Sequence, residues 1–248
     1  MELYGLIGKE INHSFSPEFF KKKFARFGLR ADYRLFPLEN IDQLPELIAT
    51  QPDLKGLNVT IPYKRLVSRF LQEIAPSALY TGSVNTIQVK RDRKIFRLIG
   101  YNTDIIGFEK SLLPFIKGRK NLKALILGDG GSSRSVSYVL RKLGIIFIHV
   151  SRTPQKVSQI SYQWITPDIM AGYHLIINTT PLGMTPHVET LPDIPYSLIT
   201  PDHLIYDVVY NPMETVFLRR AREQGAQIKG GLEMLEFQAE ASWKIWKK

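Results

Sequence analysis

The segment that most constrains the fold is residues 123–134, which read Lys-Ala-Leu-Ile-Leu-Gly-Asp-Gly-Gly-Ser-Ser-Arg. The continuous apolar run at residues 124–127 is typical of a strand buried on both faces, as in a parallel sheet. A helical apolar pattern over residues 136–143 follows the glycines and ends before Gly144. The sequence therefore predicts a strand, a glycine turn and a helix.

This arrangement favours a dinucleotide. Glycines let the backbone turn tightly and approach a ligand, and the free N–H groups and dipole of a helix start attract a pyrophosphate. The match to Gly-x-Gly-x-x-Gly is incomplete, because Asp129 lies near the expected phosphates and Ser133 occupies the third glycine position. An ordinary strand–helix turn without a ligand is the alternative for this stretch alone.

The end of the next predicted strand, residues 145–150, indicates which dinucleotide is bound. NAD-binding proteins usually have an Asp or Glu there, about 20 residues past the glycines, to bind the ribose 2′-hydroxyl. This chain has Ser151, Arg152 and Thr153 instead, with Lys156 shortly after. Two cations and two hydroxyls suit a 2′-phosphate, so we expect NADP(H). A solvated basic turn is the alternative.

Composition excludes several classes of protein. The absence of cysteine excludes disulfides, thiolate metal sites and cysteine nucleophiles, and we expect no metal. The net charge of +10 is spread over scattered short groups without a nucleic-acid-binding module. Residues 1–10 lack a basic leader, and no apolar run approaches the roughly 18 residues of a membrane span. We therefore expect a cytoplasmic monomer or homodimer that binds small molecules, not nucleic acid or membrane.

A candidate carboxylate site lies near the N-terminus. Ser16 suits the N-cap of a helix, Pro17 suits its first position, and phenylalanines at helical spacing, ending with Phe27, form its buried stripe. Ser14 adds a second hydroxyl beside this helix start. Such a site suits a small anion, although serines that cap a helix without any ligand are more common.

Two charged residues are predicted at helix starts. Pro62 suits the first position of a helix, which places Lys64 in the first turn, where the helix dipole destabilises an ammonium. Asp104 follows a predicted hairpin at residues 85–99 and begins an apolar helix, where it can act as an N-cap. An exposed lysine and a capping aspartate are the alternatives to a functional pair.

Further strands are predicted at residues 175–178, 204–209 and 226–229, followed by an amphipathic helix at residues 232–246. Each strand runs into a loop at its carboxyl end, where ligands bind in open parallel α/β sheets. The chain is therefore predicted to be an α/β protein with two α/β domains.

Eight short segments together resemble the shikimate dehydrogenase family over essentially the whole chain. They occur in the family's order, at residues 13–17, 58–64, 84–86, 102–104, 128–131, 151–153, 178–184 and 236–239. The resemblance implies NADPH-dependent, reversible reduction of 3-dehydroshikimate to shikimate, in chorismate and aromatic amino-acid biosynthesis. It also implies an N-terminal substrate-binding catalytic domain (residues 1–101 plus 232–248), to which the C-terminal helix returns, and a Rossmann-like NADP-binding domain (residues 102–231).

The resemblance also implies roles for individual residues. Lys64 and Asp104 would form the catalytic pair and contact the substrate. The substrate carboxylate and hydroxyls would be bound by Ser14, Ser16, Thr60, Asn85, Tyr210 and Gln238. The pyrophosphate would lie on Gly128, Asp129, Gly130, Gly131 and Ser132, the 2′-phosphate on Ser151, Arg152, Thr153 and Lys156, and the nicotinamide near Val208 and Gly231.

Three departures from the family pattern concern the cofactor. Asp129 replaces a small residue, Ser151 replaces Asn, and Gly230 stands where Asp is common. None of them removes a catalytic group.

Two other functions compete with this interpretation. One is a quinate/shikimate dehydrogenase that uses NAD, against which Arg152 and the paired serines argue. The other is a non-catalytic, nucleotide-binding regulator with the same fold, against which the retained Lys64 and Asp104 argue.

Overall fold

The computed structural model describes residues 1–12, 14–92, 95–155 and 157–248, and it divides into two compact units. Unit 1 comprises Met1–Ile106 and Gln238–Lys248, and unit 2 comprises Gly107–Phe237. The chain passes from one unit to the other inside helix α4 (Asp104–Phe115) and again inside α8 (Leu232–Trp246). The units divide after residues 106 and 237, whereas the predicted domains divide after residues 101 and 231. The difference arises because each transition occurs inside a continuous helix and not in the loop before it.

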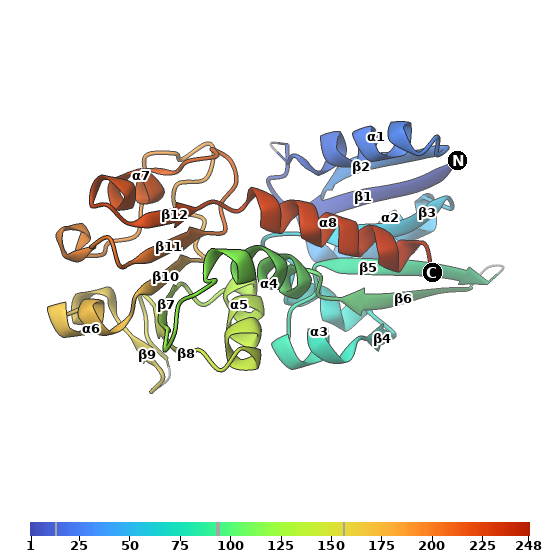
Figure 1. The fold of residues 1–248 in the computed structure, drawn as a ribbon. Helices are drawn as coiled ribbons and strands as arrows, with labels where there is room; N and C mark the ends of the chain where they lie inside the picture. The colour runs from blue at the N-terminus through green and yellow to red at the C-terminus, as the bar shows by residue number, and fades with distance from the viewer. Residues whose placement is uncertain (13, 93–94, 156) are drawn as a thin grey trace. The chain divides into compact units, whose positions relative to one another are not determined.

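The described part of unit 1 forms a six-stranded mixed sheet in the order β2-β1-β3-β5-β6-β4 (Figure 1). The strands are β1 (Glu2–Gly8), β2 (Ala31–Pro37), β3 (Leu54–Val59), β4 (Glu73–Ile74), β5 (Thr86–Asp92) and β6 (Ile95–Tyr101). β1 runs parallel to β2 and β3, whereas β5 runs antiparallel to β3 and β6. The carboxyl ends of β1, β3 and β6 therefore meet the amino end of β5 at one edge of the sheet.

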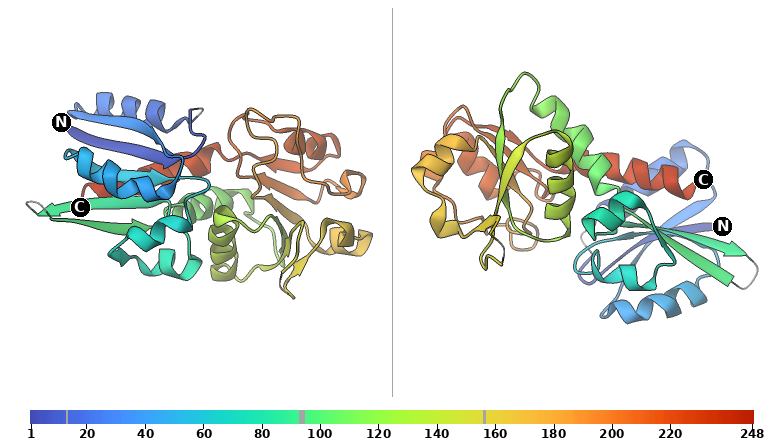
Figure 2. Two further views of the ribbon diagram at one scale, coloured as in Figure 1. Left: turned by 180° about the vertical axis from the view of Figure 1, so that it is seen from behind. Right: turned by 90° about the horizontal axis from the view of Figure 1, so that it is seen from below.

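Helices cover both faces of this sheet (Figure 2). On one face, α1 (Ser16–Arg26) and α8 pack around Tyr4, Phe20 and Trp246. On the other face lie the 3-10 helices η1 (Ile41–Gln43) and η2 (Leu66–Phe70) with α2 (Leu44–Thr50) and α3 (Pro76–Thr81).

Trp246 fastens the C-terminal helix to unit 1. Its indole stacks on Tyr4, with 4.9 Å between ring centroids, and its Nε1 donates to the Ile87 carbonyl at 3.0 Å. The indole lies so close to Gly56 that an added Cβ would be 2.2 Å from its Nε1. This contact confirms the prediction that α8 returns to the first domain.

The described part of unit 2 forms a six-stranded parallel sheet in the order β12-β11-β10-β7-β8-β9. The strands are β7 (Lys123–Leu127), β8 (Ile146–Val150), β9 (Gln159–Ile160), β10 (Leu175–Asn178), β11 (Leu204–Asp207) and β12 (Gln227–Lys229). The core on one face includes residues of α6 (Pro167–Gly172) and α7 (Val216–Glu223). On the opposite face, Phe108 of α4 contacts Tyr206, and Ser137 of α5 (Gly131–Lys142) contacts His149.

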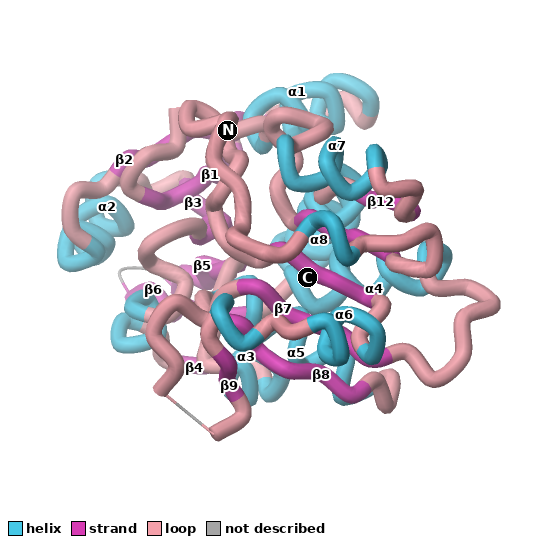
Figure 3. The backbone as a smooth tube through the Cα atoms, turned by 90° about the vertical axis from the view of Figure 1, so that its left-hand side faces the viewer, coloured by secondary structure: helices cyan, strands magenta, loops and turns pink. Residues whose placement is uncertain are grey.

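Short 3-10 helices η3 (Tyr162–Trp164) and η4 (Tyr196–Leu198) lie in the longer connections of unit 2, which Figure 3 otherwise draws as loops. The parallel sheet with helices on both faces confirms the Rossmann-like prediction. In the part of the chain that the structure describes, none of the helices has the length and apolar character needed to span a bilayer.

The prediction of an α-helix that starts at Pro62 is wrong. Residues 61–65 form a turn with a cis Ile61–Pro62 peptide bond, and only the 3-10 helix η2 follows. Tyr63 is buried and its hydroxyl donates to the Leu38 carbonyl at 2.6 Å, so packing into the core determines this conformation. Lys64 therefore does not lie in the first turn of an α-helix, and the dipole argument does not apply to it.

Two predictions for α1 are also wrong. Ser16 is the first helical residue, and Phe15 is the N-cap. Phe27 is 59% exposed, because it is the C-cap residue and its backbone has left the helical stripe.

The core of unit 2 contains a buried carboxyl group at the end of β11. Asp207 Oδ1 accepts from Asn178 Nδ2 and from the Val209 N–H, each at 3.0 Å, and Oδ2 accepts from Thr215 Oγ1 at 2.7 Å. Burial raises the pKa of Asp207 to about 7, although the three hydrogen bonds act in the opposite direction.

We expect Asp207 to make the folded protein less stable as the pH rises. Its folded pKa of about 7 lies above its ordinary value, so between the two the folded state holds a proton that the unfolded chain has lost. That contribution is present at low pH and is lost as the pH rises through about 7. Asp207→Asn removes the titration but keeps an oxygen for Asn178 and Val209. Urea unfolding between about pH 5 and about pH 8 should show a smaller pH dependence of the unfolding free energy in this variant. An unchanged pH dependence would contradict the assignment.

Candidate active site

An ion pair between Lys64 and Asp104 forms the centre of the candidate site. Lys64 Nζ lies 2.6 Å from Asp104 Oδ2, and the two side chains are 15% and 7% exposed. Lys64 lies in the turn after β3, where its carbonyl accepts from the Val84 N–H at 2.8 Å. Asp104 is the first residue of α4, just after β6. The edge at which β3 and β6 end therefore brings together two charges that are 40 residues apart in the chain.

Asn85 holds the second oxygen of the Asp104 carboxylate. It immediately precedes β5, the strand between β3 and β6, and its Nδ2 donates to Asp104 Oδ1 at 2.7 Å. The same amide group lies 3.4 Å from Gln238 Oε1 on α8. On the other side, Asn85 Oδ1 accepts from the Thr103 N–H at 2.7 Å. The structure thus brings four of the predicted residues together: Lys64, Asn85, Asp104 and Gln238.

A buried polar network continues behind Asn85, and the sequence interpretation did not identify it as part of the site. Ser242 on α8 is its centre, because its Oγ lies 2.8 Å from Thr86 Oγ1 and 3.1 Å from Thr103 Oγ1. It also accepts from Asn58 Nδ2 at 3.0 Å, and Tyr33 donates to Asn58 Oδ1 at 2.8 Å. The only sequence signal for Ser242 is its position four residues after Gln238, on the same side of the helix.

The two serines lie in the connection between β1 and α1. Ser14 Oγ accepts from the Ser16 N–H at 3.2 Å, so the first N–H of α1 is bound by a side chain that precedes the helix. Ser16 is buried and Ser14 partly exposed. Thr60 follows β3, and its N–H donates to the Ile7 carbonyl at 2.9 Å. All three residues therefore lie near the sheet edge that carries Lys64; His13 lies outside the described residues.

In unit 2, the glycine turn has the expected backbone. Gly128 has φ of +105°, a conformation that strongly favours glycine, and its N–H donates to the Val150 carbonyl at 2.8 Å. Gly130 is the N-cap of α5 and Gly131 its first residue, with no side-chain hydrogen bond to the cap. A Cβ added to Gly130 would meet nothing within 4 Å. This helix start is open, with its backbone donors available to an anion.

The basic residues predicted for the 2′-phosphate follow β8. Arg152 and Thr153 are exposed, whereas Ser151 is buried. Ser151 Oγ accepts from the Thr153 N–H at 3.3 Å and donates to Asp129 Oδ2 at 3.5 Å, so the unusual acid of the glycine turn lies beside Ser151. Ser132 is partly exposed in the first turn of α5, and Lys156 lies outside the described residues.

The residues predicted near the nicotinamide contact one another. The Gly231 N–H donates to the Val209 carbonyl at 3.0 Å, and a Cβ on Gly231 would lie 2.2 Å from the Val208 carbonyl oxygen. Glycine is therefore required for this close approach. Tyr210 follows in the same loop of unit 2, whereas the other residues predicted to bind substrate belong to unit 1.

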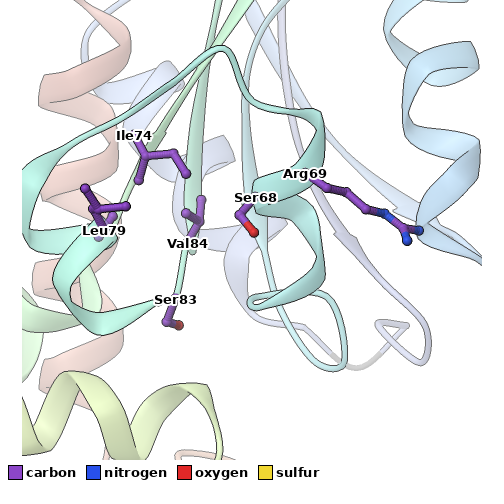
Figure 4. A pocket seen from close by; sticks show the side chains of 8 residues that line it. Ser68, Arg69, Ile74, Leu79, Ser83 and Val84 are labelled. Atoms are coloured by element: carbon purple, nitrogen blue, oxygen red, sulfur yellow. The ribbon is translucent and has the colours of Figure 1, made fainter.

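A pocket elsewhere in unit 1 contains none of the predicted site residues (Figure 4). Its lining residues are Ser68, Arg69, Ile74, Ala78, Leu79, Gly82, Ser83 and Val84. The lining is mainly apolar and carries no pair of ionisable groups comparable to Lys64 and Asp104.

Residues 6–87 match the family model of the shikimate dehydrogenase substrate binding domain. The chain is 37% identical, over 261 residues, to shikimate dehydrogenase (NADP(+)) of Carboxydothermus hydrogenoformans, with 99% of this chain and 91% of that protein covered.

Solved structures give the same result. Shikimate dehydrogenase from Aquifex aeolicus matches with a TM-score of 0.87 and 33% identity, over 99% of this chain and 92% of that one. The Thermus thermophilus enzyme, solved with NADP(H) and shikimate, matches with a TM-score of 0.83 and 28% identity, over 99% and 93% of the two chains. With these similarities over nearly its whole length, the chain belongs to the shikimate dehydrogenase family.

Proposed function

We propose that this protein catalyses the NADPH-dependent, reversible reduction of 3-dehydroshikimate to shikimate, a step in chorismate and aromatic amino-acid biosynthesis. The observation that carries the proposal is the largely buried Lys64–Asp104 pair, which a further hydrogen bond from Asn85 holds in place. The Thermus thermophilus relative, whose structure contains NADP(H) and shikimate, supports the choice of substrate and cofactor.

Reducing a ketone to an alcohol requires a hydride on the carbon and a proton on the oxygen. Bound NADPH supplies the hydride. We assign the proton to Lys64, whose ammonium donates it to the developing alkoxide and whose amine accepts it again in the reverse direction. Asp104 orients the ammonium from 2.6 Å, and its other oxygen is fixed by Asn85. Because both Asp104 oxygens are already bound, the carboxylate is held in one orientation before any substrate arrives.

The remaining unit 1 residues would bind the substrate. Ser14 and Ser16 supply hydroxyls for its carboxylate, and Thr60 and Gln238 supply polar groups for its hydroxyls, with Tyr210 contributed from unit 2. Asn85 already bonds to Asp104, Gln238 and Thr103, which supports a role in holding Asp104 together with its role toward substrate.

The glycine turn and the loop after β8 fit NADP. The open start of α5 suits the pyrophosphate, with donors from Gly130, Gly131 and Ser132, and the exposed Arg152 and Thr153 suit the 2′-phosphate. Asp129 would belong to the pyrophosphate site and Lys156 to the 2′-phosphate site. Val208 and Gly231 would flank the nicotinamide. On this assignment unit 1 is the catalytic domain and unit 2 the NADP-binding domain of a cytoplasmic monomer or homodimer.

We expect Lys64→Met to lower kcat for shikimate oxidation by about a hundredfold or more, the scale of one general acid, with little change in KM. Steady-state kinetics on the folded variant measure this. Lys22→Met, which changes an exposed lysine on α1, is the matched control and should behave like the wild type. A near-normal kcat for Lys64→Met would exclude Lys64 as the proton donor.

We expect Arg152→Ala to raise the KM for NADP⁺ by roughly 10- to 100-fold, because only NADP loses charge-assisted bonds to a 2′-phosphate. The KM for NAD⁺ should change little, and Arg219→Ala, an exposed arginine on α7, should change neither value. Equal changes for both cofactors would contradict the 2′-phosphate site.

Replacing the serines tests the carboxylate site. Ser14→Ala and Ser16→Ala should each weaken shikimate binding by about 1 to 3 kcal/mol if their hydroxyls bond to a charged group, and NADPH binding should stay unchanged. Substrate titration and cofactor titration of each variant measure the two effects separately. If both variants keep the wild-type affinity for shikimate, these serines serve only the helix start.

A further inference from the structure

The third glycine position of the nucleotide motif holds Ser133, and the structure shows what this serine contacts. Ser133 lies in α5 and is fully buried, and its Oγ donates to the Gly128 carbonyl at 3.0 Å. Its hydroxyl therefore closes the turn across five residues, from the start of the helix back to the end of β7. A glycine at this position could not make this bond.

His149, on the neighbouring strand β8, lies against the same two groups. Its Nδ1 is 3.1 Å from Ser133 Oγ and 3.3 Å from the Gly128 carbonyl oxygen. Its Nε2 is 2.9 Å from Ser137 Oγ, one helical turn further along α5. The ring thus connects β8 to the glycine turn with one nitrogen and to the body of α5 with the other.

The hydrogen-bond directions are consistent with a fixed ring. Ser133 Oγ donates its one hydrogen to the Gly128 carbonyl at 3.0 Å, so its oxygen accepts from the N–H of His149 Nδ1 at 3.1 Å. With Nδ1 as the donor in a neutral ring, Nε2 is the acceptor, and the Ser137 hydroxyl donates to it at 2.9 Å. Each nitrogen then has its own partner, which sets the ring orientation.

Gly128 is consequently held on both sides. Its N–H is bound to the Val150 carbonyl at 2.8 Å, and its own carbonyl faces Ser133 Oγ and His149 Nδ1. Because a peptide unit is planar, fixing this carbonyl also fixes the direction of the next N–H, that of Asp129. The direction of the donors that follow Gly128 therefore depends on the bonds made by Ser133 and His149.

We propose that His149 is a positioning residue of the pyrophosphate loop, which acts through Ser133 and the Gly128 carbonyl to aim the backbone donors of the glycine turn at the cofactor. This inference rests on the proposed function, since it takes residues 128–132 as the pyrophosphate site. It adds to that function a group on β8 that does not itself touch the cofactor.

Two amide substitutions test the roles of the two ring nitrogens separately. In His149→Asn the amide can replace Nδ1 and keep the link to Ser133, whereas in His149→Gln it can replace Nε2 and keep only the link to Ser137. Dissociation constants of NADPH and NADH, from titration of each folded variant, are the readout, with kcat at saturating cofactor measured alongside.

We expect His149→Leu and His149→Gln to weaken both cofactors by about tenfold, the scale of one lost orienting hydrogen bond, because both cofactors carry the pyrophosphate. His149→Asn should stay near the wild type, and kcat at saturation should change little in all three. Ser133→Ala should reproduce the weakening, and it keeps the test decisive if a His149 variant does not fold.

Three results would overturn the inference. Unchanged affinity in His149→Gln and Ser133→Ala would show that the glycine turn does not need these bonds. Equal losses in His149→Asn and His149→Leu would show that the ring acts only by packing. A loss for NADPH alone would place the effect at the 2′-phosphate. Failure of the proposed function looks different, because the wild-type protein would then bind neither cofactor, or Arg152→Ala would bind NADPH as well as the wild type does.

Discussion

The ion pair between Lys64 and Asp104 is the interaction on which the candidate site in unit 1 depends. Two charges that are mostly removed from water lose much of their hydration, and their attraction offsets this only when the remaining oxygen also has a donor. Asn85 supplies that donor, and Thr103 fixes which way the Asn85 amide points. The pair is therefore held before substrate binds, which is the arrangement that proton transfer at a defined atom requires.

The sheet topology explains why these residues can meet. An antiparallel β5 between β3 and β6 brings its first residues to the edge where its neighbours end, and α8 adds Gln238 and Ser242 from the far end of the chain.

The buried carboxyl group of unit 2 differs from Asp104 in its partners. Asp207 has three hydrogen-bond donors, but none of the bonds described for it comes from a cation, and burial raises its pKa to about 7.

The sequence predicted correctly those elements whose conformation depends on neighbouring residues in the chain. The apolar strand, Gly128 and the helix after it agree with the structure, because a positive φ and a buried parallel strand leave clear marks in a sequence. The helix expected at Pro62 is wrong, since burial of Tyr63 outweighs the preference of proline for helix starts. Ser242 and His149 could not be identified, because Ser242 contacts Thr86 across 156 residues and His149 contacts Ser133 on another element.

Whether Lys64 and Asp104 act as one unit is tested most directly by a double-mutant cycle on kcat. The measurement compares Lys64→Met, Asp104→Asn and the double variant, each checked for folding and for NADPH binding. If the carboxylate acts by orienting the ammonium, removing it after the lysine is gone should cost little more, and the double variant should resemble Lys64→Met. Two losses that simply multiply would contradict this account, because each residue would then contribute to catalysis independently of the other.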